Sequence, residues 1–395
     1  MTNEVKKVPE LRFPEFDGEW EGIYLNKLGM FKKNYTFSRA NEGDGTLRHI
    51  HYGDIHSKFK SKIEKIELLP SISIDLEDPQ LVQNNDLIFA DASEDYNDLG
   101  KTILMKVNNG NVIAGLHTHL FSPNNNLNSE FLLYFTQTKV YRKFIKRQGV
   151  GISVLGISKK NLDKLLVSLP KYNEQKKIGE FFSKLDQQIE LEEQKLEKLE
   201  EQKKGYMQKI FSQELRFKDG SGNEYPEWED VKLQNIANIK KGEQIKKENI
   251  DNNGKYYHLN GGTTASSRTN LFNTNPFTIS ISEGGNSCGF IKMNKEYFFS
   301  GGHNYTLLDL SVSNFYLYAY LKYHEKKIMS LRVGSGLPNI QKKDISNYLI
   351  KIPRKEEQEK IGSFFKNLDE FIEKQANKVE LLKQRKQSFL QKMFV

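Results

Sequence analysis

Hydrophobic residues recur at alternating steps of four and three in two stretches of the chain, 178–210 and 361–393. This spacing is typical of a coiled-coil seam, where apolar side chains of one helix pack against those of another. The apolar seam residues are Ile178, Phe182, Leu185, Ile189, Leu196, Leu199, Tyr206 and Ile210, then Ile361, Phe365, Leu368, Ile372, Val379, Leu382, Phe389 and Met393. No proline interrupts either stretch, and Pro170 and Pro353 lie just upstream, at a natural helix boundary. We therefore predict two long helices.

Each predicted seam contains two polar positions at the same offsets. Glu192 and Lys203 lie in the first seam, and Gln375 and Lys386 lie in the second. In an antiparallel pair, one register sets Glu192 against Lys386 and Lys203 against Gln375. A parallel, in-register pair would set Lys203 against Lys386, two like charges in a seam. We predict an antiparallel pair within one chain; the alternative is that each polar residue faces solvent at a frayed point.

The two helical stretches also repeat one sequence. EQKKIGEFFSKLDQQIE (174–190) and EQEKIGSFFKNLDEFIE (357–373) are identical at 11 of 17 positions. Two shorter echoes are GYMQKIF (205–211) with SFLQKMF (388–394), and PELRF (9–13) with QELRF (213–217). A repeat of about half the chain is too long for a solenoid unit, so it indicates two tandem modules.

The remaining segments, 1–170 and 213–353, have the pattern of globular domains. Short apolar runs bounded by Gly, Asn and Asp predict strands, and these runs are DLIFA (86–90), KTILMKV (101–107), NVIAGL (111–116), FTISIS (277–282) and YFFSGG (297–302). A stretch with a helical pattern follows in each segment, at 129–146 and at 313–330. We predict an α+β fold in which two tandem globular domains are separated by the two long helices.

Composition narrows the class of protein. Of 395 residues, 28% are charged and 37% are hydrophobic, which is typical of a globular chain with room for two or three domains. The sequence contains no apolar run long enough to span a bilayer and no apolar signal core at its start, so we expect no membrane segment and a cytoplasmic location. The single cysteine, Cys288, excludes an intrachain disulfide and fits a reducing compartment. A net charge of +8 permits binding to a polyanion without requiring it.

Local signatures of catalysis are missing. The glycine cluster SEGGNSCGF (282–290) lacks the Gly-Lys-Ser/Thr ending of a phosphate-binding loop. NTNPF (273–277) lacks the second proline of the motif found in amino-methyltransferases, and no cofactor glycine loop accompanies it. The histidine groups 49–56 and 117–119 have no acidic or cysteine partner at ligand spacing, so we predict no metal site and expect surface or groove-facing histidines. We expect no catalytic residues in this chain.

Three polar segments have the composition of a binding surface. RHIHYGDI (48–55) combines a cation, imidazoles and an aromatic ring, and KKGEQIKK (240–247) is basic. YYHLNGGTTASSRTN (256–270) is rich in small side chains that form hydrogen bonds. Such residue types suit phosphates and base edges, although each segment taken singly also fits a solvated loop. As a set in two tandem modules, they favour nucleic acid.

With these motifs in place, the chain resembles the specificity subunits of type I restriction–modification enzymes. The residues that carry the resemblance are RFPEFDGEW (12–20) with YPEW (225–228), LVQNNDLIFA (81–90), VGSGLPNIQKKDISNYLIKIP (333–353) and the repeated EQxKIGxFFxxLD helices. One departure is that the first half has GVGISVLGISKK (149–160) where the second has VGSGLPNIQKK (333–343). That difference puts a shared role of this turn in doubt.

The resemblance implies a domain plan. Residues 1–170 and 213–353 would be two target-recognition domains, each reading one half of a split site in double-stranded DNA. Residues 171–212 and 354–395 would be spacer helices that form the intramolecular coiled coil. The expected partners are two methyltransferase (modification) subunits and motor/nuclease (restriction) subunits. Those partners would carry S-adenosylmethionine, ATP and magnesium, leaving this chain without a cofactor.

We assign candidate DNA contacts from residue type, within these segments and, for Arg39, just before the first of them. In the first domain they are Arg39, Arg48, His49, His51 and Tyr52; in the second they are Lys241, Gln244, Lys246, His258, Asn260, Thr263, Ser266 and Arg268. Basic members would mostly contact phosphates, and Asn, Gln, His and Arg would read bases. The competing hypothesis is a coiled-coil scaffold whose globular ends bind protein, without DNA recognition.

Overall fold

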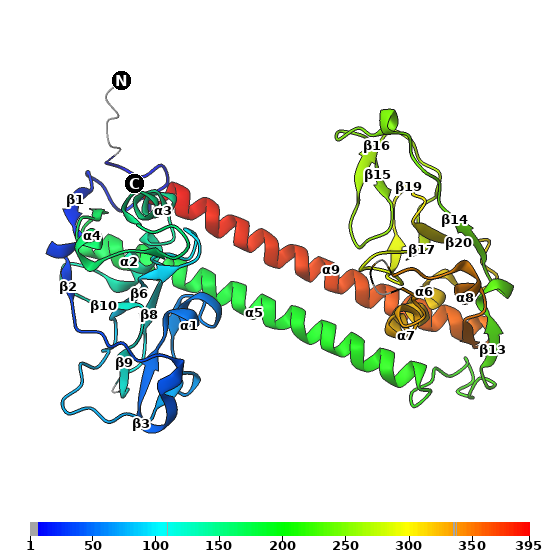
Figure 1. The fold of residues 1–395 in the computed structure, drawn as a ribbon, viewed down its shortest axis with the longest axis horizontal. Helices are drawn as coiled ribbons and strands as arrows, with labels where there is room; N and C mark the ends of the chain where they lie inside the picture. The colour runs from blue at the N-terminus through cyan, green and yellow to red at the C-terminus, as the bar shows by residue number, and fades with distance from the viewer. Residues whose placement is uncertain (1–6, 109, 335, 337) are drawn as a thin grey trace. The chain divides into compact units, whose positions relative to one another are not determined.

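The computed structural model describes residues 7–108, 110–334, 336 and 338–395. The chain divides into two compact units: unit 1 consists of residues 1–192 and 378–395, and unit 2 of residues 193–377. Each unit combines sheets with helices and includes part of helix α5 (Tyr172–Phe211) and part of helix α9 (Lys355–Lys392), as Figure 1 shows. The predicted α+β class is confirmed.

Unit 1 is built mainly from short strands. Its strands are β1 (Glu21–Tyr24), β2 (Gly29–Phe31), β3 (Glu42–Ile50), β4 (Lys62–Ile63), β5 (Ser71–Ile72), β6 (Leu87–Ala90), β7 (Ala92–Ser93), β8 (Thr102–Met105), β9 (Val112–Ala114), β10 (Thr118–Pro123), β11 (Leu155–Gly156) and β12 (Leu166–Leu169). Its short helices are α1 (Tyr52–Ser57), α2 (Ser129–Phe135), α3 (Lys139–Gln148) and α4 (Lys159–Leu162). The apolar runs at 86–90, 101–107 and 111–116 form β6, β8 and β9, as predicted.

Unit 2 follows the same order with fewer elements. Its strands are β13 (Glu229–Lys232), β14 (Asn238–Lys241), β15 (Tyr256–Leu259), β16 (Ser267–Thr269), β17 (Thr278–Ser282), β18 (Ile291–Asn294), β19 (Phe298–Ser300), β20 (Asn304–Leu308) and β21 (Leu349–Ile352). Its short helices are α6 (Asn314–Tyr323), α7 (Glu325–Met329) and α8 (Lys342–Ser346). The predicted strands at 277–282 and 297–302 correspond to β17 and β19.

The sheets of the two units share one topology. Unit 1 has the strand order β2-β10-β6-β8-β4, and unit 2 has β14-β20-β17-β18. A second sheet, β5-β3-β9 or β16-β15-β19, contains one parallel pair in each unit. A third pairing joins β1 with β12 and β13 with β21. The repeat seen in the helices therefore extends through both globular parts.

The stretches predicted as single helices are each divided in two. In unit 1, α2 ends before Thr136, and Thr138 begins α3 by accepting a hydrogen bond from the backbone N–H of Tyr141 (3.3 Å). In unit 2, α6 ends at Tyr323 and α7 starts at Glu325. Threonine favours helix N-termini because its hydroxyl satisfies a free backbone N–H, which explains the break in unit 1.

The repeated EQxKIG motif attaches each long helix to its globular part. Gln175 donates from Nε2 to the carbonyl of Pro170 (2.9 Å) and accepts at Oε1 from the backbone N–H of Asn128 (2.9 Å). Its counterpart Gln358 donates in the same way to the carbonyl of Pro353 (2.9 Å). Because Gln175 also binds the N-cap residue of α2, the start of α5 is fixed relative to the rest of unit 1.

The preceding glutamate of the motif forms a buried ion pair. Arg12 holds both carboxylate oxygens of Glu174, with both N···O distances 2.7 Å. Arg216 holds Glu357 in the same two-pronged way, at 3.2 and 2.7 Å. The two glutamates are almost fully buried, so the paired arginine is required to compensate their loss of hydration. This explains why PELRF and QELRF accompany the repeated helix motif.

In each unit, α5 and α9 lie side by side and run antiparallel, as predicted (Figure 1). In unit 1, the Lys386 ammonium lies 2.6 Å from Asp186. In unit 2, the Lys203 ammonium lies 2.5 Å from Asp369. The repeat relates Asp186 to Asp369 and Lys203 to Lys386, so each ion pair is the counterpart of the other.

The predicted register of this coiled coil is wrong by close to one heptad. Glu192 pairs with Lys378 at 2.7 Å, whereas the prediction set it against Lys386. Lys203 pairs with an aspartate six residues before its predicted partner, Gln375. A shift of one heptad keeps the same apolar residues in the seam, so the hydrophobic pattern permits both registers and the Lys–Asp pairs select one.

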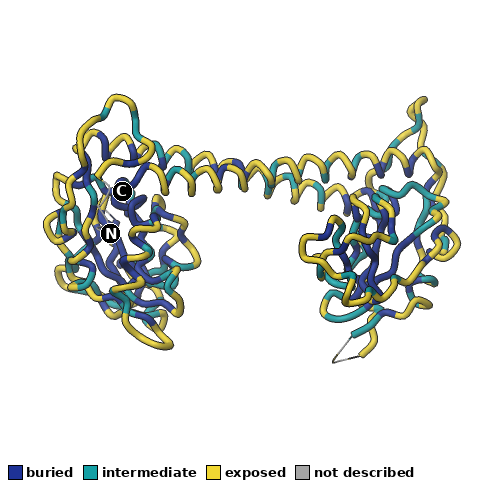
Figure 2. Tube along the Cα trace, turned by 90° about the horizontal axis from the view of Figure 1, so that it is seen from above, coloured by how far each residue is buried: buried dark blue, intermediate teal, exposed yellow. Residues whose placement is uncertain are grey.

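Each unit has its own hydrophobic core, which appears as the dark blue interior in Figure 2. In unit 1, Trp20 and Phe131 pack against Phe394 from the segment after α9, with ring centroids 6.4 and 5.2 Å away. In unit 2, Phe211 at the end of α5 takes the equivalent place and contacts Trp228 at 6.4 Å. The core of each unit thus includes the C-terminal end of one long helix.

Candidate nucleic-acid interface

The candidate residues of unit 1 lie around β3 and α1. Arg39 is half exposed, and its guanidinium binds Glu42 (2.8 Å) and Asp54 (2.9 Å). Arg48 is partly exposed and donates to the carbonyl of Leu69. Both arginines are therefore held by the protein itself, which fixes their direction and leaves only part of their donor capacity for a ligand.

Two histidines of the same segment are buried, which corrects their assignment as surface contacts. His49 is fully buried, with Nε2 3.2 Å from a carboxylate oxygen of Glu42. His51 is 8% exposed and caps α1 by accepting from the backbone N–H of Gly53 (3.1 Å). Burial lowers the pKa of His51, and a neutral ring is what an accepting cap requires. His49 faces inward from strand β3 and His51 faces inward as the N-cap of α1, so both support the surface instead of forming it.

Tyr52 is partly exposed and joins an aromatic cluster. Its ring lies 4.6 Å from that of His51, 5.4 Å from that of His56 and 5.2 Å from that of His117. His117 comes from the segment before β10, far along the chain. Tyr52 therefore connects the predicted segment 48–55 to a second segment for which no DNA contact was predicted.

Three candidates of unit 2 come together at the turn between β19 and β20. Lys241 lies 2.5 Å from Glu283, and Asn260 accepts at Oδ1 from the backbone N–H of His303 (3.1 Å). The side chain of Gln244 packs so closely on Gly302 that a Cβ there would lie 2.5 Å from it. The structure thus unites residues that the sequence placed in separate segments.

His258, like His49, is buried and its assignment is corrected. It is 5% exposed, and its Nδ1 lies 2.9 Å from the hydroxyl of Ser267. Strand pairing places His49 beside Ile113 in unit 1 and His258 beside Phe299 in unit 2, which are equivalent positions of the second sheet. Both units therefore keep a structural histidine at this point.

The remaining candidates of unit 2 are exposed. Arg268 donates to the carbonyls of Gly254 (2.7 Å) and Lys255 (2.8 Å), so it also holds its own loop. Ser266 accepts from the backbone N–H of Asn260 at 3.3 Å. The two others, Thr263 and Lys246, are exposed, and Lys246 lies 3.8 Å from Glu248.

Sequence reasoning missed an arrangement that both units share. Strands β6 and β17 are each followed directly by an acid, Asp91 in unit 1 and Glu283 in unit 2. The backbone N–H of Asp91 donates to the carbonyl of His117 (3.0 Å), and that of Glu283 donates to the carbonyl of His303 (3.0 Å). The signal was present in the sequence, since G-L-H-T-H (115–119) and G-G-H-N-Y (301–305) begin at the ends of the strand runs 111–116 and 297–302.

In unit 1 the acid lies between two imidazoles. Asp91 Oδ1 is 3.1 Å from Nδ1 of His117, and Oδ2 is 3.6 Å from Nδ1 of His119. His119 donates from Nε2 to the carbonyl of Ile157 (2.9 Å), and burial lowers its pKa. The exposed fractions differ sharply, at 47% for the His117 side chain and 10% for His119.

In unit 2 a tyrosine replaces the inner histidine. Glu283 accepts at Oε1 from the hydroxyl of Tyr305 (2.9 Å) and from Lys241, and its Oε2 lies 3.6 Å from Nδ1 of His303. Burial raises the pKa of Tyr305, so this residue acts as a hydrogen-bond donor at neutral pH. The side chain of His303 is 58% exposed.

The turn that differs in sequence between the halves has one structure at its base. Val150 and Gly156 exchange two backbone hydrogen bonds in unit 1 (2.9 and 2.7 Å), and Val333 and Asn339 exchange two in unit 2 (both 2.9 Å). Residues 335 and 337 of the second turn lie outside the described residues. In unit 1 the tip exposes Ile152 completely.

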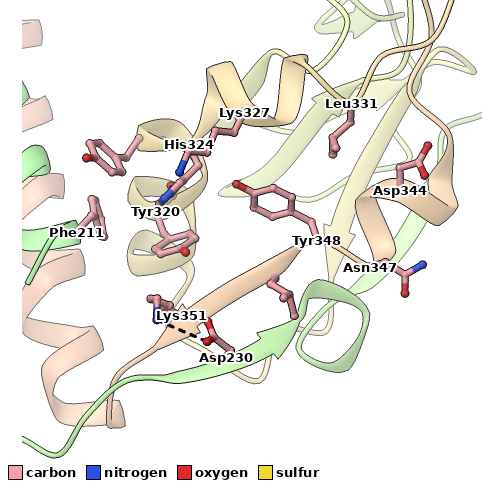
Figure 3. A pocket seen from close by; sticks show the side chains of 12 residues that line it. Phe211, Asp230, Tyr320, His324, Lys327, Leu331, Asp344, Asn347, Tyr348 and Lys351 are labelled. Atoms are coloured by element: carbon pink, nitrogen blue, oxygen red, sulfur yellow. Dashed lines mark hydrogen bonds and ion pairs between the residues drawn. The ribbon is translucent and has the colours of Figure 1, made fainter.

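Unit 2 also has an open pocket of about 680 Å³ beside α6 and β21 (Figure 3). Tyr320 and His324 stack there at 4.2 Å, and Tyr348 and the ion pair of Lys351 with Asp230 (3.6 Å) complete part of its wall. Burial lowers the pKa of His324. The pocket shares no residue with the acid–histidine arrangement, and the sequence predicted none of its lining.

Two searches of the structure bear on other classes of site. Among the residues that the structure describes, no three His, Cys, Asp or Glu side chains are grouped so that they could hold a metal ion. Within the same residues, no helix combines the length and the apolar character needed to cross a bilayer.

Two copies of one α+β domain, each packed on its own parts of α5 and α9, define a tandem-domain protein. The family model of the type I restriction modification DNA specificity domain matches residues 18–201 and 225–384. The chain therefore belongs to the family of type I restriction–modification DNA specificity proteins.

Individual relatives agree with this family. The chain is 34% identical over 173 residues to a Mycoplasma genitalium protein described as a type I specificity subunit, covering 42% of this chain and 44% of that protein. It is 27% identical over 345 residues to a Methanocaldococcus jannaschii protein described as a type I restriction enzyme specificity subunit, covering 77% and 76%. The match to the mycoplasma protein thus spans less than half of its length.

A solved structure shows the same fold. The crystal structure of a type I restriction–modification S subunit from M. genitalium aligns with a TM-score of 0.69 and 19% sequence identity, covering 98% of this chain and 99% of that one. At this level of identity the likeness concerns the fold alone.

Proposed function

We propose that this chain is a DNA-specificity subunit in which each globular domain reads one half of a split DNA site. The single observation that carries the proposal is the duplication itself. Two domains of one topology present the same acid–histidine arrangement, surrounded by different side chains. Two domains that share a fold but differ in their surface side chains are suited to reading two different short DNA sequences.

The charge and residue types around these strand ends support DNA as the ligand. In unit 2, Lys241, Gln244 and Asn260 converge on one turn. Amide side chains can bond a base edge with two hydrogen bonds, and lysine is a common phosphate contact. In unit 1, Arg39 and Tyr52 take part in the corresponding surface.

The chain would direct a larger enzyme to its DNA site. We propose that two modification subunits bind it and methylate the site, and that restriction subunits join for cleavage. Those subunits would carry S-adenosylmethionine, ATP and magnesium, whereas this chain would be non-catalytic and work in the cytoplasm. The second candidate function, a protein-binding scaffold, is not supported by any comparable observation.

Methylation mapping tests this proposal. The chain would be co-expressed with a type I modification subunit from its own genome, and adenine methylation would be mapped across the host genome. The expected result is methylation at one split motif made of two short half-sites with a fixed gap. A stable complex that produces no sequence-specific methylation would contradict the proposal and favour the scaffold.

A further inference from the structure

The two units place one histidine at the same point of the fold. Ala90 pairs with Thr118 in unit 1, and Ser282 pairs with Asn304 in unit 2, so the residues just before, His117 and His303, are equivalent. Each precedes the first residue of its strand, β10 or β20. Each also accepts a backbone hydrogen bond from the acid described above.

The neighbouring positions of these segments differ between the units. Leu116 and Thr118 flank His117, whereas Gly302 and Asn304 flank His303. The histidine and its acid nevertheless remain. The exposed fractions also indicate a binding role. The side chains of His117 and His303 are 47% and 58% exposed, whereas those of Asp91 and Glu283 are 20% and 6% exposed. An outward-facing imidazole beside a largely covered acid contributes little to a core, so the arrangement fits a binding role.

The carboxylate determines what the ring can offer. When Nδ1–H of His117 donates to Asp91, the neutral ring keeps Nε2 as an acceptor. In the major groove an acceptor matches the exocyclic amino groups of adenine and cytosine and does not match the oxygen acceptors of guanine and thymine. A ring oriented in this way can distinguish bases, whereas a freely rotating one distinguishes them poorly.

We propose that His117 and His303 are base-reading residues, one for each half-site, and that Asp91, which is hydrogen-bonded to His117, is the positioning residue that sets the hydrogen-bonding direction of that ring. Glu283 holds His303 in place through the hydrogen bond from its backbone N–H to the carbonyl of that histidine (3.0 Å). This inference rests on the proposed function. The ligand group is a base amino group of double-stranded DNA. Tyr52 beside His117, and Asn260 beside His303, lie within the same two contact areas.

The test is selection from a pool of DNA duplexes with a randomised core. The full-length chain, purified with the modification subunit, would be used as wild type and as the variants His117→Ala and His303→Ala. Each variant is expected to lose discrimination on the order of tenfold at one base pair of one half-site, and the two variants should affect different half-sites. His324→Ala, a histidine in the pocket of Figure 3, is the matched control and should select the wild-type motif.

The positioning role has its own readout. Asp91→Asn should change or relax the base preference at the pair affected by His117→Ala, with the remaining positions of the motif unchanged. Asp91→Glu carries the acid that unit 2 uses and should restore the preference. Equal weakening at every position, in either variant, would mean that the acid serves only folding and would overturn its assignment.

The outcomes separate this inference from the proposal beneath it. If the wild type selects a split motif and the two histidine variants select the same motif unchanged, the base-reading role is wrong while the proposed function stands. If the wild type selects no motif, the proposed function fails and the inference fails with it. Loss at a single pair by each histidine variant supports both.

Discussion

At the scale of single residues, Gly179 and Gly362 bring a short helix into contact with each long helix. A Cβ on Gly179 would lie 2.8 Å from Cβ of Glu130, and one on Gly362 would lie 2.8 Å from the backbone nitrogen of Tyr316. Real Cβ atoms do not approach so closely, so any larger residue would push α2 or α6 away. These glycines are therefore part of the repeated motif because of packing.

Gly362→Ala should lower the free energy of unfolding by about 1–3 kcal/mol, because the added methyl group meets backbone that cannot move freely. Gly205 of α5 is the matched control, since a Cβ at this position would meet no atom of the described residues within 4 Å. Gly205→Ala should raise stability by roughly 0.5–1 kcal/mol through helix propensity alone. Urea unfolding of the full chain measures both changes, and a stabilising Gly362→Ala would show that α6 can shift without cost.

His51 gives a pH dependence whose sign follows from its surroundings. Burial lowers its pKa below the ordinary value near 6.5; the charge of Arg39 and the ring of His49 lower it further, while Asp54 and Glu42 oppose them. The unfolded chain therefore takes up this proton first as the pH falls. The contribution of His51 to stability is complete above about pH 6.5 and is lost as the pH falls through the folded pKa.

The variant His51→Asn should weaken this dependence while preserving the helix cap, because asparagine is a strong N-cap residue. The free energy of unfolding would be measured at about pH 7.5 and about pH 5.5, on either side of the ordinary histidine pKa. The wild type should lose more stability between these values than the variant. Equal losses would show that His51 is not titrating in this range.

At the scale of elements, the two Lys–Asp pairs determine how α5 and α9 align. The side chains of Lys203 and Asp369 are 19% and 31% exposed, so the pair is partly shielded from water. In a double-mutant cycle of Lys203→Ala and Asp369→Ala, we expect a coupling energy of about 0.5–1 kcal/mol, near the upper range for exposed pairs. The reversed pair, Lys203→Asp with Asp369→Lys, should recover part of the lost stability. A coupling energy of zero would mean that apolar packing alone sets the register.

Element prediction succeeded where one physical pattern dominates. Steps of four and three predicted both long helices, and like-charge repulsion between Lys203 and Lys386 predicted their direction. The register could not be predicted, because two registers that differ by one heptad bury the same apolar residues. Asp186 and Asp369, whose ion pairs distinguish the two registers, lie beside the seam and not in it. The helix break at Thr138 was missed because apolar residues with helical spacing lie on both sides of the short polar segment TQTK (136–139).

The candidate site was predicted in part for a similar reason. Lys241 and Asn260 were named from residue type, and the fold brings both to one turn. His49 and His258 were named on the same basis, but strand alternation turned them inward, and a sequence does not show which face of a strand is buried. His303 was missed because its partner acid is 20 residues away in the chain.

At the scale of the whole molecule, a hydrogen bond between the first and last segments of the chain has a counterpart in the middle of the sequence. The backbone N–H of Leu11 donates to the carbonyl of Lys392 (2.9 Å), and that of Leu215 donates to the carbonyl of Lys209 (3.0 Å). The first hydrogen bond joins segments from opposite ends of the sequence, and the second lies within one continuous stretch. Both units therefore have the same local structure at this junction.

A circular permutant should fold for this reason. Residue 395 would be joined to residue 7 by a short flexible linker, and the chain would be opened at the turn between Gly220 and Ser221. Both residues are exposed, and the turn is held by local hydrogen bonds to Asp219. We expect one cooperative thermal transition within a few degrees of the wild type and an unchanged selected DNA motif. Loss of folding would show that the covalent connection at this turn is needed, despite the matching hydrogen bond.

The place of Phe394 also has a consequence for synthesis on the ribosome. This ring lies within 6.4 Å of Trp20, 5.2 Å of Phe131 and 5.8 Å of Phe182, all translated long before it. The first domain therefore cannot complete its hydrophobic core until the end of α9 and Phe394 have been synthesised. A truncation between residues 378 and 394 would leave the second domain complete and the first domain without part of its core. Folding of the first domain therefore depends on translation of the whole of α9.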